Sequence, residues 1–191
     1  MTDPIGRFVA LLDRAREAGL PEPTAMALAT ADAQGRPSVR MVLLKGVDRD
    51  GFVFYTNLES RKAAELAANP RAALCFHWAP LEAQVRIEGR VTRTTDTEAD
   101  AYFASRPHGS QIGAWASKQS RPLPERQELE ERIIEFEAKF AGRAVPRPSF
   151  WSGFRVVPER IEFWSGQPSR LHEREVYLAD GEGWTVERLY P

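Results

Sequence analysis

Two adjacent cations, Arg61 and Lys62, stand where the sequence predicts the start of a helix. Asn57 or Ser60 can cap that helix. A helix N-terminus presents unpaired backbone N–H groups to an anion, whereas cations at that end oppose the helix dipole and need another reason for their position. The segment has the chemistry of a phosphate-binding site, although a solvated basic turn would have the same composition.

Arg40 and Lys45 lie at the two ends of an otherwise apolar run, Met-Val-Leu-Leu. A charge in such a strand is costly unless it is paired, which favours a role in binding an anion. The odd separation of the two residues would place them on opposite faces of a regular strand. A ligand shared by both cations therefore requires a bulge, the end of the strand, or a second subunit.

The C-terminal region contains the run Arg170-Leu-His172-Glu-Arg174. In an extended chain the three basic residues of this run share one face. They could form one wall of an anion-binding site, or they could belong to a strand that faces solvent. His172 could also transfer a proton near neutral pH.

Tyr102 and Arg106 are four residues apart, so they can share a face at the end of a helix. Ser110 follows in a loop with the sequence Pro-His-Gly. A phenol, a guanidinium and a hydroxyl at a helix end suit phosphate recognition. Helix capping and surface pairing would use the same residue types, so both interpretations stay open at this point.

The elements that would position these residues are mainly strands in the first half of the chain. After an amphipathic helix over residues 4–18, the composition predicts strands at 25–30, 38–45, 51–56, 71–78 and 84–94. The second and third of these strands should form a hairpin, because Asp48-Arg-Asp-Gly51 can turn the chain back. Five strands before residue 95 with short connections favour antiparallel pairing in a closed or partly closed barrel.

Helices should follow this group of strands. Thr95-Asp-Thr-Glu98 is a capping box, and the helix it begins should end near Ser105 because Pro107 follows. A short helix is predicted at 109–117, and another begins near Pro124. The latter carries an apolar stripe that indicates a core or subunit contact: Leu129, Ile133, Phe136 and Phe140. Three final strands are predicted at 155–164, 174–179 and 184–188, with a turn at 180–183 between the last two.

The composition of the 191 residues is that of an ordinary globular protein, with 42% hydrophobic and 28% charged residues. A net charge of −1 gives no bulk attraction to nucleic acid or to an anionic membrane. The single cysteine excludes an internal disulfide, and no metal signature, glycine-rich nucleotide fingerprint or nucleophile elbow is present. Because no signal peptide or membrane-length apolar run is found, we expect a cytoplasmic protein.

Several separated motifs, taken together and in order, resemble the pyridoxine (pyridoxamine) 5′-phosphate oxidase family. The resemblance extends from about residue 23 to residue 191. It is carried by Arg40-Met-Val-Leu-Leu-Lys45, Tyr55-Thr56, Ser60-Arg-Lys62, Ser105-Arg-Pro-His-Gly-Ser-Gln-Ile-Gly-Ala-Trp115, Ser117-Lys-Gln-Ser120, Phe150-Trp-Ser-Gly-Phe-Arg155, Glu162-Phe-Trp164 and Arg170-Leu-His172.

The resemblance implies an α+β, mainly β fold: an FMN-binding split β-barrel, antiparallel and Greek-key-like, with flanking helices. Residues 1–191 would form one domain, with an N-terminal helix in 1–20 and the barrel with its flanking helices in 21–191. It also implies a homodimer with active sites at the subunit interface. The reaction would be oxidation of pyridoxine 5′-phosphate or pyridoxamine 5′-phosphate to pyridoxal 5′-phosphate, with O₂ reduced to H₂O₂.

The resemblance also assigns roles by motif position. FMN would be held by Arg40, Met41, Val42, Leu43, Leu44, Lys45, Tyr55, Thr56, Arg61, Lys62, Gln84, Gln119, Ser120, Trp164 and Arg174. The substrate would be bound by Lys45, Tyr102, Arg106, Ser110, Arg170, Leu171 and His172. Among these, Arg170 and His172 would act at the pyridine ring as the catalytic pair, and no metal is implied.

Two alternatives remain beside this hypothesis. The chain could be a related split-barrel flavin oxidase that acts on another reduced ring, or a non-catalytic protein that binds FMN or pyridoxal phosphate. One local departure from the family pattern is His108-Gly109, which stands where a charged pair is more usual. This pair is expected to loosen the loop that carries Ser110.

Overall fold

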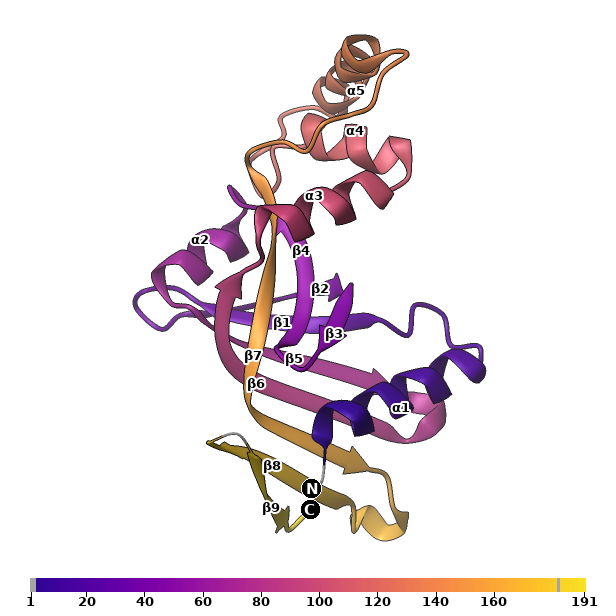
Figure 1. The fold of residues 1–191 in the computed structure, drawn as a ribbon, viewed down its shortest axis with the longest axis vertical. Coiled ribbons are helices and arrows are strands. Elements are labelled where there is room, and N and C mark those ends of the chain that lie inside the picture. Colours follow the sequence, from indigo (N-terminus) through magenta and orange to yellow (C-terminus); the bar gives the residue numbers. More distant parts are fainter. Residues whose placement is uncertain (1–2, 182) are drawn as a thin grey trace.

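The computed structural model describes residues 3–181 and 183–191. Within this part of the chain, nine strands form one sheet, and helices flank it (Figure 1). The strands are β1 (Ala25–Ala31), β2 (Pro37–Leu43), β3 (Gly46–Asp48), β4 (Gly51–Asn57), β5 (Arg71–Trp78), β6 (Ala83–Arg93), β7 (Trp151–Ser165), β8 (Glu173–Asp180) and β9 (Gly183–Leu189). The helices are α1 (Pro4–Glu17), α2 (Arg61–Ala68), α3 (Asp96–Ser105), α4 (His108–Ala116) and α5 (Arg126–Phe140), with 3₁₀ turns η1 (Ala79–Leu81) and η2 (Pro168–Arg170).

The sheet is antiparallel and runs in the order β2-β1-β5-β6-β7-β4-β3, with β8 and β9 added beyond β7. The long strand β7 pairs with β4 through residues 151–156 and with β8 through residues 160–165. Between these two stretches the β6–β7 register shifts at Glu88 and Gly89. A Cβ on Gly89 would lie 1.9 Å from the carbonyl oxygen of Val157, so only glycine permits this close approach. The curled sheet (Figure 1) confirms the predicted mainly β fold class.

One predicted pairing is wrong. The strand predicted at 38–45 was expected to form a hairpin with 51–56, but β2 pairs with β1 along its whole length. The chain leaves that edge at Leu44, whose N–H donates to the Thr24 carbonyl oxygen, and the Lys45 N–H then donates to Val53 on β4. The short strand β3 completes the hairpin, and the turn begins at Asp48 as predicted. Six strands therefore precede residue 95 in the described chain, rather than five.

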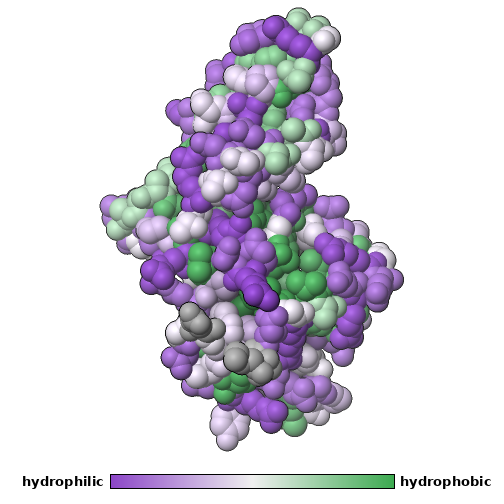
Figure 2. All heavy atoms as spheres, viewed as in Figure 1, coloured by the Kyte–Doolittle hydropathy of each residue, from purple (hydrophilic) through white to green (hydrophobic). Residues whose placement is uncertain are grey.

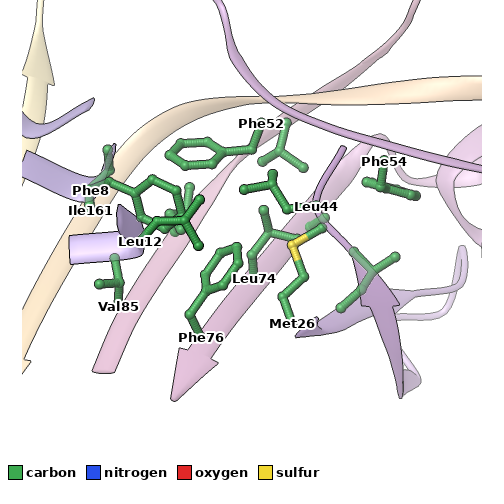
Figure 3. Packing of buried hydrophobic residues seen from close by; sticks show 14 of the residues in the cluster. Phe8, Leu12, Met26, Leu44, Phe52, Phe54, Leu74, Phe76, Val85 and Ile161 are labelled. Carbon is green, nitrogen blue, oxygen red and sulfur yellow. The ribbon is translucent and has the colours of Figure 1, made fainter. Parts of the chain in front are cut away.

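The main core lies between α1 and the inner face of the sheet. Alternate residues of β1 and β5 are buried, as the period of a strand with one covered face requires. Phe8 of α1 is fully buried, with its ring centroid 4.9 Å from those of both Phe52 and Phe76 (Figure 3). Removing this ring in Phe8→Ala would cost about 3–5 kcal/mol of stability, since it would leave a cavity among aromatic side chains.

A second apolar cluster joins α3, α4, α5 and the start of β7. The predicted stripe of α5 faces this cluster, with Phe136 and Phe140 buried and Leu129 and Ile133 packed against them. The capping box at Thr95 is present, and α3 ends at Ser105 as predicted. Figure 1 shows these helices gathered at one end of the molecule and the β8–β9 ribbon at the other.

The surface seen from this side is mainly hydrophilic, with hydrophobic residues gathered near the middle, at the level of the sheet (Figure 2). Val39 and Met41 are among the exposed apolar side chains, at 68% and 65% exposure. Both belong to the edge strand β2 and point to the same side of it. Among the described helices, none combines the length and the apolar character needed to span a bilayer. The turn predicted at 180–183 includes Glu182, which lies outside the described residues.

Candidate functional site

A cavity of about 460 Å³ opens between β2, β4, the start of β7 and the helical end of the molecule. It brings together twelve of the residues that sequence analysis selected: Arg40, Met41, Val42, Leu43, Lys45, Tyr55, Thr56, Lys62, Tyr102, Arg106, Ser110 and Gln119. It also includes five residues that the sequence did not assign individually to a binding site: Asn57, Gly113, Ala114, Ser117 and Trp151. We call it the cation-lined cavity.

The charges that line this cavity all have one sign. Four cations reach it, Arg40, Lys45, Lys62 and Arg106, and in the described part of the chain no Asp or Glu belongs to its lining. Like charges in a partly closed space repel each other and lose hydration. An anion bound among them would reduce both costs, so the cavity has the electrostatics of a phosphate site.

Arg40 and Lys45 reach the same cavity because the strand between them ends. β2 stops at Leu43, and Lys45 already follows the path toward β4. Of the three explanations that the sequence allowed for their odd spacing, the strand end is the one that the structure shows.

Lys62 is buried in the first turn of α2 beside the cavity. Its Nζ donates to Thr56 Oγ1 at 3.0 Å and to Gln119 Oε1 at 2.8 Å. Burial lowers the pKa of Lys62 to about 8, with a further decrease from the charge of Arg40 and a partial offset from Glu65. The surroundings of Lys62 therefore disfavour its protonated form, and a bound anion would stabilise that form.

Arg61 points away from the cavity. Its side chain is 65% exposed, and its Nε donates to Glu65 Oε1 at 2.8 Å. Ser60 occupies the N-cap position of α2, but its side chain makes no capping hydrogen bond there. The backbone N–H groups of this turn therefore have no side-chain acceptor at the N-cap.

Arg106 follows the last residue of α3, where Pro107 ends the helix. Its guanidinium carbon lies 4.9 Å from the centre of the Trp151 ring, and its Nη1 is buried without a hydrogen-bond acceptor. Burial lowers the pKa of Arg106. A buried guanidinium nitrogen that lacks an acceptor is costly, and a phosphate oxygen in the cavity would satisfy it.

An aromatic stack forms one wall beside Arg106. The rings of Tyr55, Tyr102 and Trp151 are nearly parallel and contact one another, with centroid distances of 4.1 Å for Tyr55–Tyr102, 5.3 Å for Tyr55–Trp151 and 6.1 Å for Tyr102–Trp151. The stack joins β4, α3 and β7, so it fixes the end of α3 relative to the sheet. This arrangement places Tyr102 and Arg106 on the same side of the cavity, as their spacing predicted.

The loop after α3 is held from two sides. Gln111 Nε2 donates to the carbonyl oxygens of Phe103 and Ala104 at the end of α3. His108 Nε2 lies 2.7 Å from Glu137 Oε2 of α5. His108 thus links this segment to a neighbouring helix, and the loosening expected from His108-Gly109 stays a prediction. Ser110 occupies the first turn of α4 and lines the cavity.

Arg170 and His172 do not lie on a strand, so their predicted shared face with Arg174 is wrong. Ser169 and Arg170 have φ of +59° and +62°, and β8 begins only at Glu173. Two successive left-handed residues turn the chain, so the two-residue period of a strand does not apply there. His172 instead packs on Trp164 at 4.6 Å between ring centroids.

Arg174 is held by a buried carboxylate. Its Nε donates to Glu162 Oε1 at 2.9 Å, and its Nη1 donates to the Tyr190 carbonyl oxygen at 3.0 Å. Glu162, which is 1% exposed, also accepts hydrogen bonds from Arg86 and Arg160. Burial would raise the pKa of Glu162, but these hydrogen bonds outweigh burial and lower it to about 2.

Nine of the selected residues do not line the cation-lined cavity. Leu44 is in the main core, Gln84 lies beside Trp164 in the β6–β7 register, and Ser120 lies in the loop after α4. Arg170, Leu171, His172 and Arg174 belong to the C-terminal segment, which Figure 1 places toward the β8–β9 end. Most of the selected residues therefore lie either in the cation-lined cavity or near the C-terminal segment, whereas Leu44, Arg61 and Ser120 lie outside both.

Comparison with known proteins gives consistent matches over nearly the whole chain. A family model described as pyridoxamine 5′-phosphate oxidase matches residues 12–140. A second, described as the pyridoxine 5′-phosphate oxidase C-terminal dimerisation region, matches residues 151–191.

Curated relatives and solved structures agree with these models. Proteins named pyridoxine/pyridoxamine 5′-phosphate oxidase from Myxococcus xanthus (strain DK1622) and Anaeromyxobacter dehalogenans (strain 2CP-C) are 62% and 61% identical. Each match covers 99% of this chain, with 92% and 96% of the relative. The crystal structure of PhzG from Burkholderia lata 383 in complex with tetrahydrophenazine-1-carboxylic acid has a TM-score of 0.95 at 34% identity, covering 100% of this chain and 94% of that one. A pyridoxamine 5′-phosphate oxidase-related, FMN-binding protein from Nostoc punctiforme PCC 73102 shares the fold, with a TM-score of 0.80 at 18% identity and full coverage of both chains.

Proposed function

Because the chain belongs to the pyridoxamine 5′-phosphate oxidase family of FMN-dependent oxidoreductases, we propose that it oxidises pyridoxine 5′-phosphate and pyridoxamine 5′-phosphate to pyridoxal 5′-phosphate. The electrons would pass to O₂, which is reduced to H₂O₂. The relatives at 61–62% identity carry this activity in their names.

The observation that carries the proposal is the charge of the cation-lined cavity. Both FMN and the proposed substrates are phosphate monoesters, and the four lining cations without a lining carboxylate match such groups. The buried Arg106 Nη1 without an acceptor supplies a specific place for one phosphate oxygen. A neutral ligand would not relieve the repulsion among the four cations or their loss of hydration.

The residues present fit FMN on one side of the cavity. Arg40, Thr56, Lys62 and Gln119 would hold it, because they are linked to each other by hydrogen bonds or charge and line one continuous surface. Bound FMN supplies the acceptor for two electrons and a hydrogen from the substrate. Six residues assigned to FMN binding lie outside the cavity lining, and their roles remain predictions: Leu44, Arg61, Gln84, Ser120, Trp164 and Arg174.

The other side of the cavity would take the substrate phosphate. Lys45, Tyr102, Arg106 and Ser110 offer two cations and two hydroxyl groups there. The Tyr55–Tyr102–Trp151 stack makes this side rigid, so the phosphate would orient the substrate with little reorganisation of the protein.

A second subunit would complete the site. The C-terminal match is to a dimerisation region, which supports a homodimer. Leu171 and Tyr190 of this region are 69% and 95% exposed, and Val39 and Met41 beside the cavity are similarly exposed. We propose that Arg170 and His172 of one subunit reach the cavity of the other. There Arg170 would polarise the ring substituents, and His172 would orient them or move a proton.

A second candidate activity comes from the structural comparison. PhzG was solved with tetrahydrophenazine-1-carboxylic acid and is 34% identical to this chain. A flavin oxidase that acts on another reduced ring is therefore the alternative. A carboxylate could also accept from Arg106, but a phosphate brings more oxygen atoms and more negative charge to the four cations of the cavity.

The test is O₂ consumption by FMN-loaded protein with each of four compounds: pyridoxine 5′-phosphate, pyridoxamine 5′-phosphate, non-phosphorylated pyridoxine and tetrahydrophenazine-1-carboxylic acid. We expect turnover of the two phosphorylated compounds with formation of H₂O₂ and pyridoxal 5′-phosphate. Turnover of the phenazine precursor alone would establish the alternative oxidase. Binding of FMN or pyridoxal 5′-phosphate without O₂ uptake from any compound would establish a non-catalytic binding protein.

A further inference from the structure

Glu65 lies behind the cation-lined cavity, in the middle of α2. Its side chain is only 6% exposed, and donors from three elements meet its two oxygens. Oε2 accepts from Thr30 Oγ1 of β1 at 2.5 Å, from Ser38 Oγ of β2 at 2.6 Å and from Arg40 Nη2 of β2 at 3.3 Å. Oε1 accepts from Arg61 Nε at 2.8 Å. One carboxylate therefore joins two strands and a helix at the edge of the cavity.

The same contacts fix the direction of Arg40. Its Nη1 donates to Thr30 Oγ1 at 2.6 Å and to the Leu28 carbonyl oxygen at 3.1 Å, and its Nη2 donates to Ser38 Oγ. Each of the two hydroxyl groups accepts from Arg40 and donates to Glu65. The carboxylate thus sets the orientation of both hydroxyls, and through them the position of the guanidinium that lines the cavity.

Glu65 also balances charge around Lys62. The charged groups that act on Lys62 are Arg40 from β2, which lowers its pKa, and Glu65 from its own helix, which raises it. Thr56, Ser60 and Gln119 give it neutral hydrogen-bond partners. Arg61 lies in the same cluster of charges, because it forms an ion pair with Glu65. Three cations and one buried carboxylate therefore lie close together around α2.

We propose that Glu65 is a positioning residue for phosphate binding: it holds Arg40 in place and offsets the repulsion between Arg40 and Lys62, the two cations that line this end of the cavity. The inference rests on the proposed function, because it takes the FMN phosphate as the anion that these cations bind. Glu65 itself would not contact FMN, since it does not belong to the cavity lining.

The test compares FMN with riboflavin, which lacks the phosphate, by fluorescence titration of flavin-free protein across pH 6–9. In wild type, FMN affinity should fall as pH rises through about 8, where Lys62 loses its proton. Glu65→Gln removes the charge that supports protonated Lys62, so this fall should begin at lower pH. At neutral pH the variant should bind FMN about tenfold more weakly, because Arg40 would no longer be held by Glu65 in the position from which it contacts the phosphate. Riboflavin affinity should not change.

Two further variants separate charge from position. Glu65→Asp keeps the negative charge but is too short to reach all four donors, so it should weaken FMN binding without moving the pH dependence. Glu59→Gln is the control, because it removes the same charge from a residue that pairs with Arg121 rather than with Arg40, Arg61 or Lys62. It should change neither FMN affinity nor its pH dependence. The Asp variant also keeps the test informative if Glu65→Gln does not fold.

Three outcomes would overturn the inference. In the first, Glu65→Gln binds FMN with the affinity and the pH dependence of wild type. If the Gln variant does not fold, the corresponding outcome is that Glu65→Asp binds FMN with wild-type affinity. Another is an equal loss of FMN and riboflavin affinity, which would show that Glu65 maintains only the shape of the cavity. If wild-type protein binds no FMN, the proposed function fails as well, so failure of the inference alone remains distinguishable from failure of both.

Discussion

The cation-lined cavity and the C-terminal segment 167–174 contain similar residue types but hold them in different ways. In the cavity, Lys62 and one guanidinium nitrogen of Arg106 are buried among strands and helices that are fixed by aromatic stacking and hydrogen bonds. In the C-terminal segment, Arg170 is exposed, and His172 rests on Trp164 and accepts one backbone hydrogen bond from Gln167.

The difference shows what each region lacks. The cavity has its walls but holds buried cations without a lining carboxylate, so it needs an anion. In the C-terminal segment His172 and Arg174 line a separate cavity of about 340 Å³, but Arg170 and Leu171 are exposed. A second protein surface would be needed to enclose these two residues. A homodimer in which each segment meets the other subunit's cavity would supply both needs, and the two regions can be tested separately.

The largest expected effect concerns the phosphate. Non-phosphorylated pyridoxine would leave Arg106 and Lys45 without their anion, and sites built on polar contacts reject such analogues by about 10⁴-fold or more. We expect this difference in kcat/KM between pyridoxine 5′-phosphate and pyridoxine, measured with FMN-loaded protein. Comparable values would show that the cavity does not bind the substrate phosphate.

Arg106→Ala should give the next largest effect. Loss of one charge-assisted contact of about 1.5–3 kcal/mol corresponds to a decrease of roughly 10- to 150-fold in kcat/KM for the phosphorylated substrate. The kcat/KM for pyridoxine should change little, so the ratio of kcat/KM for pyridoxine 5′-phosphate to kcat/KM for pyridoxine should decrease. The thermal stability of the ligand-free protein should fall only slightly, because removal of the buried Nη1, which has no acceptor, offsets the lost packing of Arg106 on Trp151.

Arg126→Ala is the matched control for this variant. Arg126 pairs with Glu130 on the exposed face of α5, with 81% of its side chain accessible. The Arg126→Ala substitution should change neither the ratio of kcat/KM values for the two substrates nor the thermal stability. An unchanged ratio in Arg106→Ala would remove Arg106 from the phosphate site.

Arg170→Ala and His172→Asn test the other region. Each should lower kcat/KM for pyridoxine 5′-phosphate by about tenfold or more, as expected for loss of a general acid–base or polarising group. FMN binding and thermal stability should remain, because neither residue lines the cation-lined cavity or the core. Wild-type kinetics in both variants would contradict the proposed ring contact.

A mixing experiment then asks whether the two regions meet across subunits. Arg106→Ala and Arg170→Ala subunits, unfolded and refolded together, should form hybrid dimers with one intact site and one doubly altered site. Statistical mixing predicts recovery of about a quarter of wild-type activity, since half of the dimers are hybrids. If both residues of a site came from one chain, the mixture would be no more active than its components.

The smallest expected effect concerns the stability of the protein in acid, to which two buried carboxylates contribute. The pKa values of Glu65 and Glu162 are lowered from about 4.5 to about 2 in the folded protein. Their stabilising contribution is therefore present above pH 4.5 and is lost as pH falls toward 2. Glu162→Gln should be less stable than wild type at neutral pH, and its stability should fall less between about pH 5 and pH 3. Urea unfolding at several pH values measures this, and a parallel pH dependence in variant and wild type would contradict it.

The sequence was sufficient for the local elements whose signals lie within a few residues. The capping box at Thr95, the end of α3 before Pro107 and the apolar stripe of α5 were all predicted from short-range patterns. The types of the cationic residues also predicted phosphate binding, and the structure brings four cations together in one cavity. These features depend on side-chain chemistry and on the helical or strand period, both of which are local.

Only the tertiary structure decided which strands pair and which cations meet. β2 pairs with β1 rather than with β4 because the chain changes sheet edge at Leu44, and strand pairing depends on contacts distant in sequence. That change brings Arg40 and Lys45 to one cavity despite their odd spacing. Burial of Arg106 against Trp151, and the turn that removes Arg170 from the strand, likewise depend on packing and backbone conformation that no residue type specifies alone.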